Sequence, residues 1–112
     1  MEKLGSIFFE LSNDERLDIL IMLESRPETF THISERLSLN SQQLSRHITR
    51  LIEAQLIEKH PEGAYHISNY GKVVLRLSES FDFVTENREY LTSHDLTRIP
   101  YEFVARLGDL YK

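Results

Sequence analysis

Hydrophobic positions recur every three or four residues along several stretches of the chain, and residues 41–53 show this pattern best. Leu44, Ile48 and Leu51 lie on one side of a helix built from this stretch, with Ile52 beside them. The other side carries no acidic residue and consists of Ser41, Gln42, Gln43, Ser45, Arg46, Thr49 and Arg50. An ordinary solvated helix is one interpretation. The other is a helix in the major groove of DNA, where carboxylates would repel the phosphates.

Two shorter segments before this helix also have helical periodicity. In the first, Ser12 and Glu15 form a predicted capping box, and Pro27 ends the helix. Its predicted buried positions are Leu17, Leu20, Ile21 and Leu23. Residues 28–30 predict a very short strand, and Thr31 is the predicted cap of a second helix. That helix is expected to bury Ile33 and Leu37 before a turn in which Leu39 points inward and Asn40 or Ser41 caps the helix at 41–53.

Residues 57–67 predict a β-hairpin. Pro61, Glu62 and Gly63 fit a three-residue loop, because proline presets the first turn position and glycine accepts the left-handed one. This loop pairs Ile57 with Ile67, which places both on one face, as a half-buried ribbon requires. The same register pairs Glu58 with His66 and Lys59 with Tyr65.

The segment after the hairpin is predicted to be mostly helical. Ser68 is expected to cap a helix over roughly 69–84, with Val73 or Val74, Leu77, Phe81 and Val84 pointing inward. A break is expected at residues 87–88, and residues 90–96 are ambiguous between extended chain and loop. Pro100 is expected to open a last helix with an apolar face of Phe103, Val104, Leu107, Leu110 and Tyr111.

Composition narrows the possible functions. The chain has 112 residues, enough for one small domain and an additional segment, and it has no cysteine, so it has neither disulfides nor thiolate metal ligands. No apolar run is long enough to cross a membrane, and we expect a cytoplasmic protein. The net charge is −5, but residues 36–52 carry +3 and the remainder −8. The acid-free stretch therefore coincides with the predicted nucleic-acid-binding helix.

Neither enzymatic nor metal chemistry is expected. The sequence has no glycine-rich phosphate loop and no nucleophile paired with a base, so we expect no enzyme and no cofactor. Among the five histidines, His47 is predicted to be a satisfied core residue. His60 and His66 lie on the hairpin without an evident third ligand, and His94-Asp95 is a single pair, so no metal site is expected.

The order helix, short strand, helix, turn, helix, hairpin, helix is that of a winged helix-turn-helix, a mainly α fold with a small β-hairpin. The strings ERLDILIML, LSRHITRLIEAQLIEK and GAYHISNYGKVVL resemble archaeal and bacterial transcriptional regulators of the broad ArsR/MarR-like group. Gln55 stands where that group usually has glycine, which implies a less strained turn or one held by packing. Ser68 stands where it usually has threonine.

Residues 88–110 resemble the segment that follows the winged helix in archaeal two-domain regulators. The wing and the three-helix core are complete by about residue 80, so we expect a DNA-binding domain over 1–80 and an apolar segment over 81–112. This segment needs a partner surface, which is the chain's own first helix, the same segment of a second chain, or a second, effector-sensing domain of the kind that the resemblance implies. We expect a homodimer with contacts from Leu4, Phe8, Phe81, Val84, Phe103, Leu107 and Tyr111.

The predicted function is sequence-specific binding of double-stranded DNA by a transcriptional regulator. The residues expected to contact DNA are Ser41, Gln42, Gln43, Ser45, Arg46, Thr49 and Arg50, with Lys59 and His60 of the hairpin. The alternative is a winged helix that serves as a protein-interaction module in a larger assembly, which the negative charge of the remaining chain favours.

Overall fold

The computed structural model describes residues 2–93, and the chain divides into two compact units, Met1–Lys72 and Val73–Lys112. The elements are α1 (Glu2–Leu11), α2 (Asp14–Ser25), β1 (Glu28–Thr29), α3 (Phe30–Leu37), α4 (Ser41–Glu53), β2 (Ile57–Lys59), β3 (Ala64–Ile67), α5 (Asn69–Glu86) and α6 (Arg88–Ser93). The predicted helix after Pro100, with Phe103, Leu107 and Tyr111, lies outside the described residues. None of the helices described in residues 2–93 has the length and apolar character of a membrane-spanning segment.

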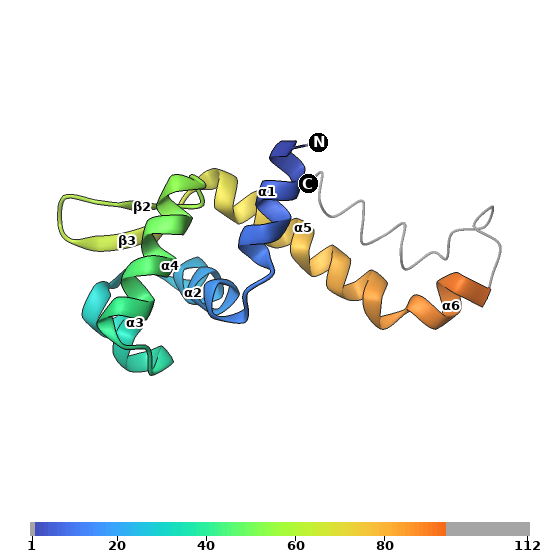
Figure 1. Ribbon diagram of the computed structural model, residues 1–112, viewed down its shortest axis with the longest axis horizontal. Helices are drawn as coiled ribbons and strands as arrows, with labels where there is room; N and C mark the ends of the chain where they lie inside the picture. Colours follow the sequence, from blue (N-terminus) through green and yellow to red (C-terminus); the bar gives the residue numbers. More distant parts are fainter. Residues whose placement is uncertain (1, 94–112) are drawn as a thin grey trace. The chain divides into compact units, whose positions relative to one another are not determined.

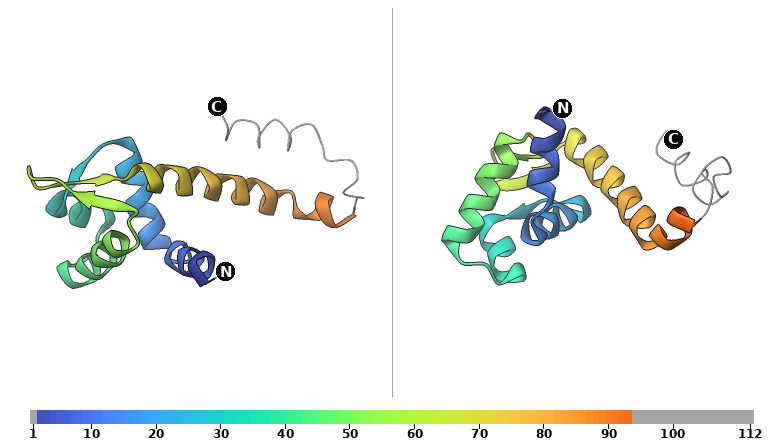
Figure 2. Two further views of the ribbon diagram at one scale, coloured as in Figure 1. Left: turned by 90° about the horizontal axis from the view of Figure 1, so that it is seen from above. Right: turned by 45° about the vertical axis from the view of Figure 1, so that its right-hand side comes forward.

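The first unit packs its helices and a three-stranded sheet around one core. The antiparallel strands have the order β1-β3-β2, and the register of β2 with β3 is the predicted one throughout. The β2–β3 hairpin extends beyond the helices of this unit (Figure 1 and the left view of Figure 2). The core is formed by aliphatic side chains of α2, α3, α4, the junction between α4 and β2, and the sheet: Ile19, Leu20, Leu23, Ile33, Leu44, Ile48, Leu51, Leu56, Ile57 and Ile67.

The predicted start and buried face of α2 are partly wrong. Asn13 caps the helix, because its side chain accepts a hydrogen bond from the amide of Arg16 at 3.0 Å. Ser12 instead follows directly after α1, and its hydroxyl donates to the carbonyl of Phe9 at 2.6 Å. The buried face includes Ile19, whereas Ile21 is 55% exposed. The sequence pattern did not show that α1 runs up to Ser12, and this extension sets where α2 begins.

The start of α3 also differs from the prediction. Thr29 caps the helix by accepting from the amide of His32 at 3.3 Å, two residues before the predicted cap. The helix begins directly after β1 and leaves no connecting residue. Ile33 and Leu39 are buried as predicted, while Leu37 is only half-buried.

The described part of the second unit consists of the rest of α5 and of α6. The predicted break is present, since α5 ends at Glu86 and α6 begins at Arg88. Residues 90–93 are helical, so both predicted alternatives, extended chain and loop, are wrong for this part of the stretch 90–96. The prediction that Leu77, Phe81 and Val84 point inward is wrong, because their exposed fractions are 44%, 58% and 40%.

Candidate nucleic-acid interface

The helix α4 is held in place by its inner face and by its first turn. Leu44, Ile48 and Leu51 are buried as predicted, so the opposite face is turned to solvent. Asn40 caps the helix by accepting from the amide of Gln43 at 2.8 Å, and the Gln43 side chain accepts from the amide of Asn40 at 3.1 Å. This reciprocal capping box fixes the start of α4. It also occupies the side-chain oxygen of Gln43, one of the predicted DNA contacts.

The outer face of α4 is polar and accessible. Ser41, Gln42, Ser45, Arg46 and Thr49 are exposed, as predicted. Four of these residues, Ser41, Gln42, Ser45 and Arg46, line an open hollow together with Phe30 of α3. No acidic side chain belongs to the lining of this hollow among residues 2–93. The first half of α4 therefore presents hydroxyl, amide and guanidinium groups that can approach phosphates and base edges.

The sequence placed Arg50 on the outer face of α4 together with the freely solvated residues. This placement is wrong for its guanidinium, which does not project freely into solvent. Its guanidinium donates two hydrogen bonds to the carboxylate of Glu10 in α1, at 2.8 and 3.1 Å. It also lies over the ring of Phe9, 4.9 Å from the ring centroid. Arg50 remains 42% exposed, but its charged group joins α4 to α1.

Sequence reasoning missed the role of Arg16 in the same cluster. Its side chain is 8% exposed and donates to the carbonyls of Glu10 and Phe9 at 2.8 and 3.2 Å, which satisfies the end of α1. The spacing did contain a signal, because Arg16 precedes Ile19, Leu20 and Leu23 by three, four and seven residues and so lies on the buried face of α2.

His47 is only partly satisfied, in contrast to the prediction. Its Nε2 lies 3.7 Å from the carboxylate of Glu15. Its Nδ1 is buried and has no hydrogen-bond partner within the described part of the chain. The imidazole of His47 therefore has one polar contact, to Glu15, and one buried nitrogen without a partner among the described residues.

The hairpin places basic and acidic groups next to each other. Lys59 is exposed and its ammonium lies 5.8 Å from the centroid of the Tyr65 ring. His60 and His66 stack with ring centroids 3.6 Å apart. The Nε2 of His66 lies 2.7 Å from the carboxylate of Glu62, and this hydrogen bond holds the pKa of Glu62 below its ordinary value. The statement that the two histidines lack a neighbouring third ligand is therefore wrong, because Glu62 lies beside both.

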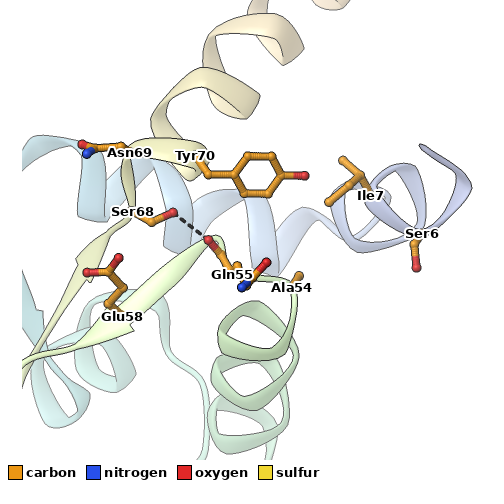
Figure 3. Close-up of a pocket in the computed structure, with 8 residues that line it drawn as sticks. All are labelled: Ser6, Ile7, Ala54, Gln55, Glu58, Ser68, Asn69 and Tyr70. Carbon is orange, nitrogen blue, oxygen red and sulfur yellow. Dashed lines mark hydrogen bonds between the residues drawn. The ribbon is translucent and has the colours of Figure 1, made fainter. Parts of the chain in front are cut away.

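The junction after α4 contains a strained residue. Gln55 has a φ of +63°, so the expectation of a less strained turn is wrong, and packing holds the turn instead. The hydroxyl of Ser68 lies 2.7 Å from the Gln55 carbonyl and 3.0 Å from the Leu56 carbonyl, and it accepts from the amide of Gly71 at 2.8 Å. Figure 3 shows the bond between Ser68 and Gln55 at the edge of a hollow of about 740 Å³.

Replacing Gln55 by glycine is expected to stabilise the protein by about 1 kcal/mol, because glycine adopts positive φ without steric cost. Chemical denaturation of both proteins measures this difference. Gln55→Ala is the matched control, since it removes the same exposed side chain but keeps the Cβ atom. A gain of equal size in Gln55→Ala would show that backbone strain is not the cause.

The fold has counterparts among known proteins. A family model for a helix-turn-helix domain matches residues 11–60. The winged helix-turn-helix DNA-binding domain of Mb0332 from Mycobacterium bovis, a homodimeric fragment described as a possible ArsR-family transcriptional regulator, superimposes with a TM-score of 0.64. It is 24% identical over 77% of this chain and 81% of that chain. The first unit has the winged helix-turn-helix fold.

Two other structures have this fold. Reduced HlyU from Vibrio cholerae has a TM-score of 0.61 and 25% identity, over 80% of this chain and 90% of that one. Sco5413 from Streptomyces coelicolor, a MarR family transcriptional regulator, has a TM-score of 0.61 and 18% identity, over 86% of this chain and 70% of that one. No curated protein matches the sequence. The resemblance to archaeal two-domain regulators stays a prediction.

Proposed function

We propose that this winged helix-turn-helix protein is a transcriptional regulator that binds double-stranded DNA, with α4 in the major groove. The observation that carries the proposal is the exposed, acid-free outer face of α4, fixed by the buried side chains of Leu44, Ile48 and Leu51. A helix in the major groove needs such a face, because phosphates surround it and base edges offer hydrogen-bonding groups. The match to a helix-turn-helix family and the regulators among the similar structures support the same function.

The two halves of α4 have different roles in this proposal. Ser41, Gln42, Ser45 and Arg46 contact DNA, because they are exposed around the hollow beside α3. Thr49 extends this surface by one turn. Arg50 contacts DNA only at the cost of its two hydrogen bonds to Glu10, so its main effect is on the position of α4 relative to α1. Lys59 of the hairpin contacts the phosphates beside the groove. The Nε2 of His60 faces the carboxylate of Glu58 at 3.3 Å, so His60 is left out of the proposed DNA surface.

Arg46→Ala is expected to weaken binding to duplex DNA by roughly 1–3 kcal/mol and to leave the melting temperature unchanged. Arg50→Ala is expected to lower the melting temperature, because it leaves the carboxylate of Glu10 without two of its hydrogen-bond donors. Fluorescence anisotropy with a random-sequence duplex and thermal melting measure the two effects.

Arg76→Ala is the matched control for Arg46→Ala. Arg76 is an exposed arginine of α5, so its removal changes the net charge equally. If Arg46→Ala and Arg76→Ala weaken binding to the same extent, the net charge explains the effect and the face of α4 does not. Unchanged binding by Arg46→Ala would contradict the proposed orientation of α4.

The proposed regulator acts as a homodimer. Val73, Leu77, Phe81 and Val84 follow each other at helical spacing along α5, and all are at least 40% exposed. An apolar stripe of this kind is typical of an interface, and the similar domain from M. bovis is homodimeric. Leu4 and Phe8 of α1, exposed by 44% and 45%, are further candidates, as are Phe103, Leu107 and Tyr111 outside the described residues. Two-fold symmetry would present two copies of α4 to successive turns of DNA.

Leu77→Glu is expected to convert the dimer into a monomer, because a carboxylate would be buried in the apolar interface. Light scattering of the full chain at tens of micromolar measures the mass. Arg76→Glu, next to it on the same helix but off the stripe, is expected to remain dimeric. A monomeric unmodified chain, or a dimer that survives Leu77→Glu, would contradict an interface on α5.

A further inference from the structure

The tip of the β2–β3 hairpin gathers three metal-ligating side chains from the two sides of its loop. His60 precedes the loop, Glu62 is its central residue and His66 lies in β3. One donor atom from each residue falls within 4.8 Å of the other two. The geometry points to a binding site for a divalent transition-metal ion of the zinc class on the hairpin, formed by His60, Glu62 and His66.

Of the two distances from the Glu62 carboxylate to the histidine nitrogens, one is shorter and the other is longer than the distance between two ligand atoms in a metal site. In a tetrahedral zinc site with bonds of about 2.0–2.2 Å, neighbouring ligand atoms lie roughly 3.3–3.6 Å apart. The Glu62 carboxylate oxygen lies 2.7 Å from Nε2 of His66 and 4.0 Å from Nδ1 of His60. Metal binding would replace the first contact, shorten the second and tilt the two stacked imidazoles apart. We expect side-chain rotations to provide these changes.

Backbone hydrogen bonds fix the hairpin on both sides of the loop that carries the ligands. The amide of Gly63 donates to the carbonyl of His60 at 2.9 Å, and the amide of His60 donates to the carbonyl of Ala64 at 3.0 Å, which closes the loop. The strand β3 is paired on both sides, with β1 and with β2. Ligands on a rigid support lose little conformational entropy when they bind an ion.

Glu58 supplies an orienting group behind the ligands. Its carboxylate lies 3.3 Å from Nε2 of His60, so this nitrogen can donate to it while Nδ1 faces the metal. A carboxylate that orients a histidine in this way is a common feature of metal sites. Two imidazoles and one carboxylate suit zinc, cobalt, nickel or copper better than magnesium or calcium. Three protein ligands also leave a fourth position open for water or an external oxygen.

The ion would reverse the charge of the hairpin. With neutral histidines, Glu58, Lys59 and Glu62 give residues 57–67 a net charge of −1, and a divalent ion raises it to +1. A negative hairpin repels DNA phosphates and a positive one attracts them. We therefore expect the ion to tighten DNA binding through the hairpin, an expectation that rests on the proposed function.

Isothermal titration of the metal-free full chain with Zn²⁺ alone tests the site without DNA. One ion per chain is expected to bind. His66→Asn and Glu62→Gln are each expected to weaken binding at least about tenfold, and Glu58→Gln about tenfold. His32→Asn is the matched control, because His32 also pairs with a glutamate, Glu28, but is not part of the group formed by His60, Glu62 and His66. Circular dichroism verifies the fold of each variant. No binding, or binding that His66→Asn and Glu62→Gln leave unchanged, would overturn the site.

A second titration tests the effect on DNA. Zn²⁺ is expected to increase the affinity of the unmodified chain for a random-sequence duplex and to have no such effect on His66→Asn. If the ion binds at the hairpin but leaves DNA affinity unchanged, the charge reversal has no role and that part of the inference is wrong. If the chain binds no DNA with or without the ion, the proposed function fails, whereas the titration with Zn²⁺ alone still decides the metal site.

Discussion

Gly71→Ala is expected to lower the free energy of unfolding by about 3 kcal/mol, the upper end of what overpacking usually costs. A Cβ atom at this position would lie 2.2 Å from the carbonyl oxygen of Leu56 and 2.8 Å from Cγ1 of Ile67. The carbonyl cannot move aside easily, because it accepts from the amide of Ser68 at 2.9 Å and lies 3.0 Å from the Ser68 hydroxyl. The clash therefore separates the start of α5 from the junction between α4 and β2. Urea denaturation measures the loss.

Gly5→Ala is the matched control for this substitution. Gly5 lies within α1, and an added Cβ there would meet no atom within 4 Å. Alanine favours helix by up to about 1 kcal/mol relative to glycine, so this variant should be slightly stabilised. If Gly71→Ala and Gly5→Ala have the same effect on unfolding, the close approach of α5 to Leu56 has no energetic importance.

Leu44→Ala is expected to cost roughly 2–5 kcal/mol, because it leaves a cavity under α4. The Leu44 side chain has no exposed surface, and its neighbours on the same face, Ile48 and Leu51, are also buried. Since a small domain has only about 5–15 kcal/mol of stability, this variant should be largely unfolded at moderate denaturant concentrations. Chemical denaturation followed by circular dichroism measures the change.

Ile52→Ala provides the comparison on the same helix. The Ile52 side chain is 40% exposed although the sequence places it beside the buried stripe, so its truncation should cost well below half as much as that of Leu44. Equal losses at the two positions would mean that α4 is rotated about its axis, and the outer face proposed to bind DNA would then be a different one.

The sequence predicted the elements whose signals are local. The hairpin register follows from a loop of Pro61, Glu62 and Gly63, in which Gly63 has the expected positive φ of 98°. The helix α4 has the predicted bounds, because its period and its cap act within a few residues. The caps of α2 and α3 were misplaced where the end of a neighbouring element, at Leu11 and at Thr29, determines where the helix starts.

Contacts between distant parts of the chain could not be predicted in this way. The pair of Glu10 with Arg50 joins residues 40 positions apart, and no periodicity in either helix indicates it. The cluster at the hairpin tip had a signal that was not used. The predicted register already placed His66 opposite Glu58. His60 directly precedes the short loop and Glu62 is its central residue, so a third ligand was available from sequence alone.

The dependence of DNA affinity on salt concentration tests the proposed function most directly. The affinity of the full chain for a random-sequence duplex is measured from about 50 to 200 mM salt, with Arg46→Ala in parallel. A regulator that places the outer face of α4 among phosphates should lose affinity steeply as counterions compete, with a logarithmic slope of about −0.9 for each phosphate neutralised. Measurable binding with this steep slope, weakened in Arg46→Ala, is the predicted result. No binding at the lowest salt concentration, or an affinity that does not change with salt, would contradict it and favour a protein-interaction module.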